Sequence, residues 1–388
     1  MPVIIAADRT LKSHADEMLI VYISTAGAPS GSQFPLGPRG RVVGSAASSP
    51  RRPKGDRTMS YTLFTQATGK SVEPYVTPDL IFRPITGLEE IDLFNALPGP
   101  YNDSLTEDLR NGHCRADWMW VALQDSRPVA RVGWWSRSGT RPEVLETLDI
   151  DDTCDDTSRI DIGARLLHTA LTTLFPTGTV PPQYVLQPVP PTWRDDSSTE
   201  RRIKDRIEVV RRTGGKVFVE RLRYRWTSST PLPPQLGRLT FQTVRSAEEA
   251  IDLLTRILPG TLDAYSQADV ARSSTEDYAR VQYHDELLSY SSPRAWWRIG
   301  VRSDGEPVGM VVPAQSPNGF VIAYLGVVED HRGHGFVNDL LAEGTRILAT
   351  QGAERITADT DLANQPMASA FQHAGYDNFA GRIDMRWD

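Results

Sequence analysis

The sequence predicts an α+β protein that contains two copies of one mixed helix-and-sheet fold. Three observations support this prediction: the length of the chain, an internal repeat, and a proline-rich segment between the repeats. The 388 residues are enough for two ordinary domains, because a single hydrophobic core rarely serves more than about 250 residues. The composition, with 39% hydrophobic and 23% charged residues, is that of a globular protein.

Each copy begins with the same pattern. The first segment runs from Phe82 to Gly99, and the second runs from Phe241 to Gly260. Both contain a Glu-Glu pair followed by Ile-Asp-Leu, and both close with Leu-Pro-Gly. Apolar residues recur three to four positions apart in each, so each segment predicts a short strand, a turn and an amphipathic helix.

Two further blocks match in the same order. Hairpins are expected at Trp118–Trp135 and at Trp296–Pro313, and the second has the strong turn signal Asp-Gly. Each copy closes with an alternating strand, at Val217–Arg225 and at Phe379–Trp387. Matching blocks in a conserved order indicate an internal repeat rather than two unrelated domains.

The repeat fixes the expected domain boundaries. We expect one domain over residues 78–227 and a second over residues 237–388. Residues 228–236 contain three prolines and predict a semi-rigid linker. Residues 1–60 include a stretch rich in Gly, Ser, Pro and Arg, so they predict a disordered extension or a start codon assigned upstream of Met59.

Charge and composition exclude several classes of function. The net charge of −7 argues against a broad nucleic-acid surface. No run of 18 apolar residues is present, so no membrane span is expected. The two cysteines, Cys114 and Cys154, cannot form a disulfide framework or a cysteine metal cluster. We expect a cytoplasmic protein with neither a nucleic-acid nor a membrane partner.

The second copy contains a strand, a glycine-bearing turn and a helix in succession. Gly319–Val328 reads as a buried strand, and an apolar helix is expected from Val337 onward. The first N–H groups of a helix lack intrahelical partners and carry partial positive charge, so this turn predicts an anion site. Gly333 and Gly335 would let a pyrophosphate approach the backbone, and Arg332 would add a fixed charge. The spacing differs from G-x-G-x-x-G, which disfavours a dinucleotide-binding fold.

Two motifs carry a family resemblance. Arg332-Gly333-His334-Gly335-Phe336-Val337 resembles the GNAT N-acetyltransferase pattern Gln/Arg-x-x-Gly-x-Gly/Ala, with Val337 at the sixth position. The segment Asn364–Tyr376 resembles the family's Asn-x-x-Ala-x-x-x-Tyr-x-x-x-Gly-Phe. It has Met367 where Ala is usual and Phe371 where Tyr is usual.

The resemblance implies two tandem GNAT folds, each a mixed, mostly antiparallel twisted sheet flanked by helices. It also implies transfer of an acyl group, acetyl in the first instance, from acetyl-CoA to a small-molecule amine by direct attack in a ternary complex, without a metal. The backbone N–H of Val327 or Val328 would polarise the thioester carbonyl, and Asn364 would orient the cofactor arm. The residues expected to hold acetyl-CoA are Leu325, Val327, Val328, Arg332, Gly333, His334, Gly335, Phe336, Val337, Asn364 and Phe371.

This sequence lacks the family's usual acid, and several of its residues are candidates for the base. The family's acid is a Tyr, and its replacement by Phe371 would lower the rate by about 100-fold to 10,000-fold. One face of the 319–328 strand offers no ionisable group, and strict alternation puts Tyr324 on the other face. The candidates for the base are Glu329, His331, His334 and the polar run 283–286. Of these, Glu329 and His284 are the two predicted catalytic residues.

The first copy lacks the glycine turn. Five aspartates crowd the corresponding place and would repel phosphates: Asp149, Asp151, Asp152, Asp155 and Asp156. We expect this copy to be a structural half that shapes the acceptor cleft, with a metal site in the acidic loop as a minor alternative. For the whole protein the alternative is a non-catalytic acyl-CoA-binding or scaffold protein. The expected oligomeric state of the protein is a monomer or a homodimer.

Overall fold

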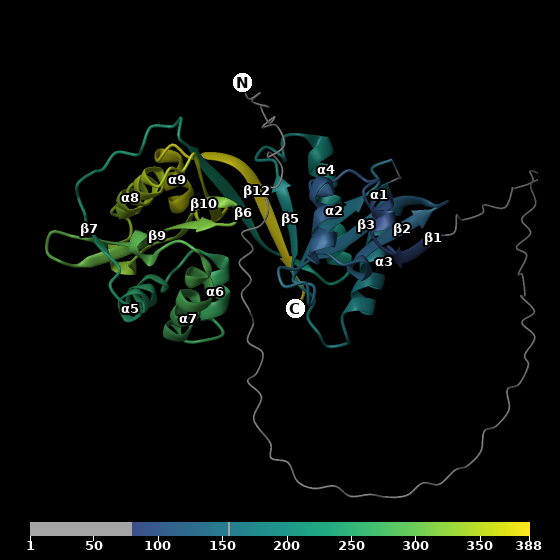
Figure 1. Ribbon diagram of the computed structural model, residues 1–388, viewed down its shortest axis with the longest axis horizontal. Helices are drawn as coiled ribbons and strands as arrows, with labels where there is room; N and C mark the ends of the chain where they lie inside the picture. The colour runs from purple at the N-terminus through teal and green to yellow at the C-terminus, as the bar shows by residue number, and fades with distance from the viewer. Residues whose placement is uncertain (1–79, 154–155) are drawn as a thin grey trace, which may run out of the picture. The chain divides into compact units, whose positions relative to one another are not determined.

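The computed structural model describes residues 80–153 and 156–388. The predicted extension, residues 1–60, lies outside them, as do Cys154 and Asp155. The described residues form one twelve-stranded sheet in the order β1-β2-β3-β4-β5-β12-β6-β11-β10-β9-β8-β7 (Figure 1). Only β4–β5 and β10–β11 pair in parallel among these neighbours. The predicted mixed, mostly antiparallel sheet flanked by helices is therefore confirmed.

The first half of the described chain contains six strands and four α-helices. The helices pack on both faces of its part of the sheet, α3 and α4 on one and α1 and α2 on the other. In chain order its elements are β1 (Leu80–Pro84), α1 (Ile91–Phe94), α2 (Asn102–Asn111), β2 (Met119–Gln124), β3 (Arg127–Trp135), β4 (Val144–Ile150), α3 (Asp156–Leu174), β5 (Tyr184–Val189), α4 (Ser197–Arg212) and β6 (Lys216–Thr227).

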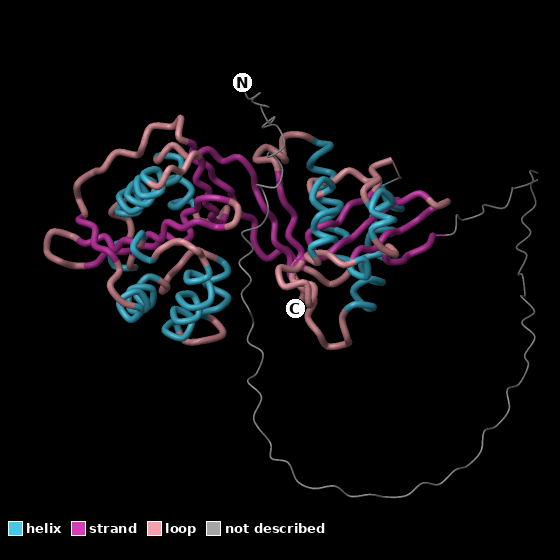
Figure 2. The backbone as a smooth tube through the Cα atoms, in the orientation of Figure 1, coloured by secondary structure: helices cyan, strands magenta, loops and turns pink. Residues whose placement is uncertain are grey.

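The second half repeats this order with a longer helical segment after its first strand. Its elements are β7 (Thr240–Thr243), α5 (Ala247–Ile257), α6 (Ala264–Val270), α7 (Thr275–Val281), a π-helical turn (Gln282–Glu286), β8 (Arg298–Val301), β9 (Pro307–Ser316), β10 (Gly319–Val327), α8 (Phe336–Thr350), β11 (Arg355–Asp361), α9 (Gln365–His373) and β12 (Asp377–Arg386). Figure 2 shows helices on both sides of the strands in this half.

Local sequence signals explain where the helices of the second half begin. The hydroxyl of Ser246 accepts the N–H of Glu249 at the start of α5, at 3.1 Å. The carboxylate of Asp263 accepts the N–H of Ser266 at the start of α6, at 2.8 Å. These are N-cap interactions, which satisfy backbone donors that a helix leaves unpaired. The apolar faces of α5 and α7 then pack on one side of the sheet, and those of α8 and α9 pack on the other.

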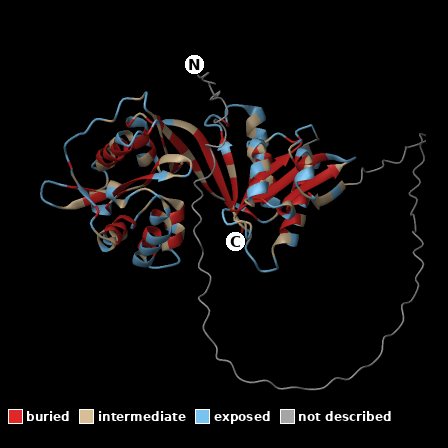
Figure 3. Cartoon of the chain, viewed as in Figure 1, coloured by how far each residue is buried: buried red, intermediate tan, exposed pale blue. Residues whose placement is uncertain are grey.

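The closing strands of the two halves are exchanged. Strand β6 ends the first half but pairs with β11 of the second half over Arg221–Thr227. Strand β12 ends the second half but pairs with β5 of the first half. The two exchanged strands also pair with each other. Much of their length is buried, as Figure 3 shows in red. The two halves therefore share one hydrogen-bonded sheet.

Each half contains one place where neighbouring parallel strands diverge. Strands β10 and β11 pair only at Phe320–Ile356 and Val321–Thr357, and β4 pairs with β5 only at Leu145–Tyr184. Beyond these pairs the strands separate, which opens a gap in the sheet beside the helix that follows. None of the helices within residues 80–153 and 156–388 has the length and apolar character to cross a membrane.

Candidate active site

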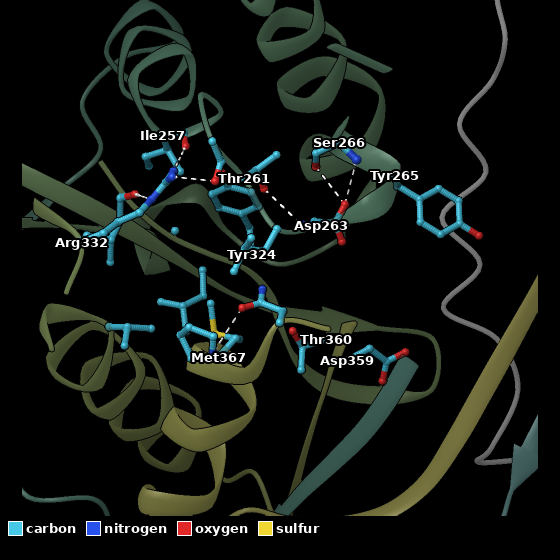
Figure 4. A pocket seen from close by; sticks show the side chains of 18 of the residues that line it. Ile257, Thr261, Asp263, Tyr265, Ser266, Tyr324, Arg332, Asp359, Thr360 and Met367 are labelled. Carbon is cyan, nitrogen blue, oxygen red and sulfur yellow. Dashed lines mark hydrogen bonds between the residues drawn. The ribbon is translucent and has the colours of Figure 1, made fainter. Parts of the chain in front are cut away.

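A cavity of about 400 Å³ lies where β10 and β11 diverge in the second half (Figure 4). Its walls come from the α5–α6 connection, β10, the turn before α8, β11 and the start of α9. All of the predicted acetyl-CoA residues except Val328 and His334 line it. The structure thus brings together two motifs that are about thirty residues apart in the sequence.

The glycine turn leaves the N-terminus of α8 open. Gly333 and Gly335 have φ angles of 78° and 74°, which L-residues with a side chain rarely adopt. A Cβ at Gly333 would meet no atom within 4 Å, so the backbone conformation, rather than crowding, requires glycine there. Gly335 is the N-cap of the fifteen-residue helix α8. Its first N–H groups and the helix dipole make this end of the cavity suitable for an anion.

Arg332 holds the turn in place through backbone carbonyls. Its Nη1 donates to Gly260 at 2.8 Å, its Nη2 donates to Ile257 at 2.5 Å, and its Nε donates to Val327 at 3.1 Å. All three nitrogens are thus directed at the protein itself, and Figure 4 shows the contact with Ile257. We expected a charge presented to phosphate, whereas the geometry makes Arg332 a brace between β10 and the end of α5.

A second arginine supports the turn from the other side. Arg238 donates to the carbonyls of His334 and Gly335 at 2.9 and 2.8 Å, and it forms an ion pair with the buried Asp339 of α8. Sequence reasoning missed this residue because it stands alone after the linker, almost one hundred positions before the turn. His334 itself is exposed, and its ring stacks on Phe336.

The backbone donor expected from Val328 is already in use. Its N–H donates to the carbonyl of Val308 on β9, at 2.8 Å. In an antiparallel pair, successive residues direct their N–H groups to opposite sides. The N–H of Val327 therefore points away from β9, toward the gap between β10 and β11. This pairing removes Val328 from the oxyanion role and leaves Val327 as the geometrically suitable donor.

Tyr324 lines the cavity, although strict alternation placed it on the opposite face. The pairing of β10 with β9 shifts register between Ile322 and Tyr324, and such a bulge resets which side chains share a face. Burial, with the nearby carboxylates of Asp263 and Glu286, raises the pKa of Tyr324 well above its usual range. The phenol therefore stays protonated and can donate a hydrogen bond or a proton.

Glu286 lines this cavity and belongs to the polar run 283–286, although it is not one of the two catalytic candidates predicted from the sequence. His284, the chosen candidate in the same run, is exposed and does not line the cavity, whereas Glu286 does. Burial and the carboxylates of Asp269 and Asp263 raise the pKa of Glu286 to about 7. Its Oε2 is buried and has no hydrogen-bond partner among the described residues. Glu329, the other candidate, is exposed and outside the lining.

Phe371 and Asn364 occupy the α9 wall. Asn364 caps α9, with its Oδ1 accepting the N–H of Met367 at 3.3 Å, so its amide nitrogen can still donate. Phe371 is 2% exposed and stacks on Tyr224 of β6, with 5.1 Å between ring centroids. A strand from the first half thus supports a wall of the cavity in the second half.

Carboxylates and arginines make up the wall opposite the glycine turn. Asp263, Glu286 and Asp359 line the cavity from three different elements. Arg221 of β6 reaches Asp361 at 3.3 Å and Asp263 at 3.5 Å. Burial raises the pKa of Asp361 to about 6. This wall suits a cationic ligand better than an anionic one.

At the corresponding place in the first half, acidic and basic side chains pair with one another. Arg206 of α4 donates to the carbonyl of Leu148 and to Asp149, at 2.9 and 2.7 Å. Asp149 also pairs with the buried Arg131. Asp151 pairs with Arg127. The described part of the chain contains no cluster of three His, Cys, Asp or Glu residues arranged to hold a metal; the side chains of Asp155 and Asp156 lie outside the description.

The family comparison finds a match within the second half of the chain. Residues 258–376 match the family model described as the acetyltransferase (GNAT) family. This segment contains the glycine turn, both diverging strands and most of the cavity wall. It is a GNAT-family domain, and acyl transfer is the general class of reaction that it represents. A comparison with curated protein sequences gives no match.

Several solved structures resemble the chain at low identity. A GCN5-related N-acetyltransferase from Sphaerobacter thermophilus is 15% identical, with 79% of this chain and 95% of that chain covered and a TM-score of 0.44. A tandem GNAT protein from the clavulanic acid biosynthesis pathway is 14% identical, with 79% and 98% covered and a TM-score of 0.42. A glucosamine N-acetyltransferase region of a fungal β-N-acetylglucosaminidase is 13% identical, with 81% and 39% covered and a TM-score of 0.47. Such values say nothing of substrate or mechanism.

Proposed function

We propose that the second half of this protein transfers an acyl group, acetyl in the first instance, from coenzyme A to the amine of a small molecule. One observation carries the proposal. A single cavity joins the open N-terminus of α8 to Glu286, a carboxylate with a pKa of about 7 and an unpartnered buried oxygen. The first feature suits a pyrophosphate, and the second suits a base that acts near neutral pH.

The residues of the turn fit the phosphate end of acetyl-CoA. Gly333 has open space where a Cβ would stand, and the backbone N–H groups at the start of α8 face no intrahelical acceptor. From there the cavity continues along Leu325 and Val327 of β10 toward Glu286. A thioester bound along this strand would place its carbonyl within reach of the cavity's polar end.

Three groups of the chain would then carry the proton and charge movements. Glu286 would take the proton that an ammonium group must lose before its nitrogen can attack the carbonyl carbon. The N–H of Val327 would stabilise the negative charge that develops on the carbonyl oxygen. Tyr324, held protonated by burial, would donate a proton to the sulfur as the carbon–sulfur bond breaks. It would replace the acid that Phe371 cannot supply.

The test is release of free coenzyme A thiol in the presence of acetyl-CoA and a panel of primary amines. The proposal predicts amine-dependent thiol release together with an acetylated product seen by mass spectrometry. Binding of acetyl-CoA without turnover on any amine would instead select the non-catalytic binder, which the replacement of the usual Tyr by Phe371 favours. No binding of acetyl-CoA would contradict both.

A further inference from the structure

The acceptor end of the cavity contains more carboxylate than one reacting amine requires. Asp263 comes from the start of α6, Glu286 from the π-helical turn and Asp359 from β11, and all three line the cavity. If Glu286 acts as the base, Asp263 and Asp359 remain as charged wall groups without a role in the proton transfer. Figure 4 shows Asp263 and Asp359 near the cavity, on separate elements.

The neighbouring arginines do not balance this charge. Arg221 lies between Asp361 and Asp263, at 3.3 and 3.5 Å, and Arg223 lies 3.5 Å from Asp359. A third guanidinium group nearby, that of Arg382, is bound by Asp384. Five carboxylates, including Glu286, therefore face three guanidinium groups. Arg332 also lines the cavity, but its donors are bound to backbone carbonyls beside the glycine turn. An excess of negative charge is left at the acceptor end.

Asp359 is the clearest site for a second cation. Its side chain is 6% exposed, and it lines the cavity. Its Oδ1 forms an ion pair with Arg223 Nε at 3.5 Å but accepts no hydrogen bond from the described residues, so it can still accept one from a ligand. A buried carboxylate oxygen that accepts no hydrogen bond is unfavourable unless a ligand supplies the missing donor.

Aromatic residues line the cavity together with the carboxylates. Tyr278 and Tyr324 line the same cavity, and burial keeps both phenols protonated by raising the pKa of each. Aromatic rings beside carboxylates suit a short apolar chain that ends in a positive charge, because the rings contact the methylene groups and attract cations.

We propose that the acceptor is a diamine-type molecule, an inference that rests on the proposed function. One amine reacts at Glu286, while the second stays protonated and is held by Asp359, with Asp263 nearby. One proton of the reacting ammonium goes to Glu286, and its nitrogen then bonds to the acyl carbon as the carbon–sulfur bond breaks. The sulfur leaves as the coenzyme A thiol with the proton of Tyr324, and the resulting phenolate takes the second proton that the nitrogen loses. The second amine keeps its proton throughout. A monoamine fills the reacting position only, and an amino acid would bring a carboxylate against Asp359.

Three acceptors of equal chain length test the proposal, because they differ only in the distal group: 1,4-diaminobutane, 1-aminobutane and 4-aminobutanoate. We expect kcat/KM for the diamine to exceed that for the monoamine by at least about tenfold, the effect of one partly buried charge pair, with the amino acid poorest. Equal values for the diamine and the monoamine, or a preference for the amino acid, would overturn it.

The variant Asp359→Asn should lower kcat/KM for the diamine about tenfold relative to that for the monoamine, so that the ratio of the two values falls to about one. Asp377→Asn, an exposed position on β12, is the matched control. An equal loss with both amines would indicate a structural role for Asp359 and contradict the inference.

Calorimetric titration of the same amines separates this inference from the proposed function. Tighter binding of the diamine, lost in Asp359→Asn, supports the inference even if no amine is acylated, in which case the proposed function fails alone. Acylation of all amines without a preference retains the proposed function and rejects the diamine. If the diamine does not bind and is not turned over faster than the monoamine, the diamine inference is also rejected.

Discussion

Phe371 of α9 stacks on Tyr224 of the exchanged strand β6, with ring centroids 5.1 Å apart and ring planes inclined by 21°. The contact joins the two halves at the wall of the cavity. It also fixes an apolar ring at the position where the GNAT pattern has a phenol. If the reaction uses a protein acid, that acid must come from elsewhere, and Tyr324 is the phenol on β10 that lines the cavity.

We therefore expect Tyr324→Phe to lower kcat by about 100-fold, the lower end of the range typical of a lost general acid. The affinity for acetyl-CoA should stay unchanged, because the substitution removes only a hydroxyl. Tyr278→Phe, at a second phenol of the same cavity, is the matched control. A wild-type rate in Tyr324→Phe would assign the acid to solvent or to no group.

Glu286→Gln should lower kcat/KM by about 100-fold or more. The wild-type value should rise with pH to a plateau above an inflection near 7, because the base works only after losing its proton and its pKa is about 7. The variant should lose this inflection. The measurement is the pH profile of kcat/KM between pH 5 and 9, with His284→Gln as the control. If His284→Gln loses the inflection while Glu286→Gln keeps it, the assignment of Glu286 as the base is contradicted.

Arg332→Met should lower the free energy of unfolding by about 2–4 kcal/mol, because a guanidinium bound to three carbonyls is removed and those acceptors are left unpaired. Urea unfolding without ligand measures this effect. Arg302→Met, at an exposed hairpin position, should change the stability little. If Arg332 served only as a charge for phosphate, its loss would leave the unliganded protein equally stable.

Glu146 of β4 should make the first half sensitive to pH. It is 5% exposed, both its oxygens lack partners among the described residues, and burial with the nearby Asp108 raises its pKa to about 8. In the unfolded chain this carboxyl loses its proton near its usual pKa of 4.5. Between pH 4.5 and 8 the native state therefore binds more protons than the unfolded state, and stability falls as pH rises.

Glu146→Gln removes this proton uptake. We expect the variant and the wild type to be about equally stable at pH 4.5, and the variant to be more stable by on the order of 4 kcal/mol at pH 8. Thermal or urea unfolding across this range measures the difference. Glu143→Gln, at the half-buried position just before β4, is the control. A variant that is less stable at every pH would show that Glu146 has a favourable charged contact.

The sequence was sufficient for features that depend on short-range signals. The repeat, the two hairpins and the glycine turn each have a local pattern, and Asn364 is both a motif residue and an N-cap. Gly333 and Gly335 could be identified because their φ angles require glycine. These features also determine most of the wall that holds the predicted acetyl-CoA residues.

Features that depend on long-range pairing could not be predicted. The strands β6 and β12 have similar alternating sequences, so no local signal says which half each will join. Two of the three carbonyl partners of Arg332 are about seventy residues away. The bulge before Tyr324 comes from the pairing of β10 with β9. A π-helical turn also changes which residues share a face, which explains why Glu286 rather than His284 reaches the cavity.

The most direct test of the central claim is calorimetric titration of acetyl-CoA into the wild type, Gly335→Asp and Gly352→Asp. Gly352 follows the C-terminal end of α8 and has a similar φ angle, 85° against 74°, with no atom within 4 Å of a Cβ, so the two variants carry comparable backbone strain. We predict micromolar binding by the wild type and by Gly352→Asp, and its loss in Gly335→Asp, where the new carboxylate meets the phosphates. Equal binding by all three proteins, or none by the wild type, would contradict the claim that the N-terminus of α8 holds coenzyme A.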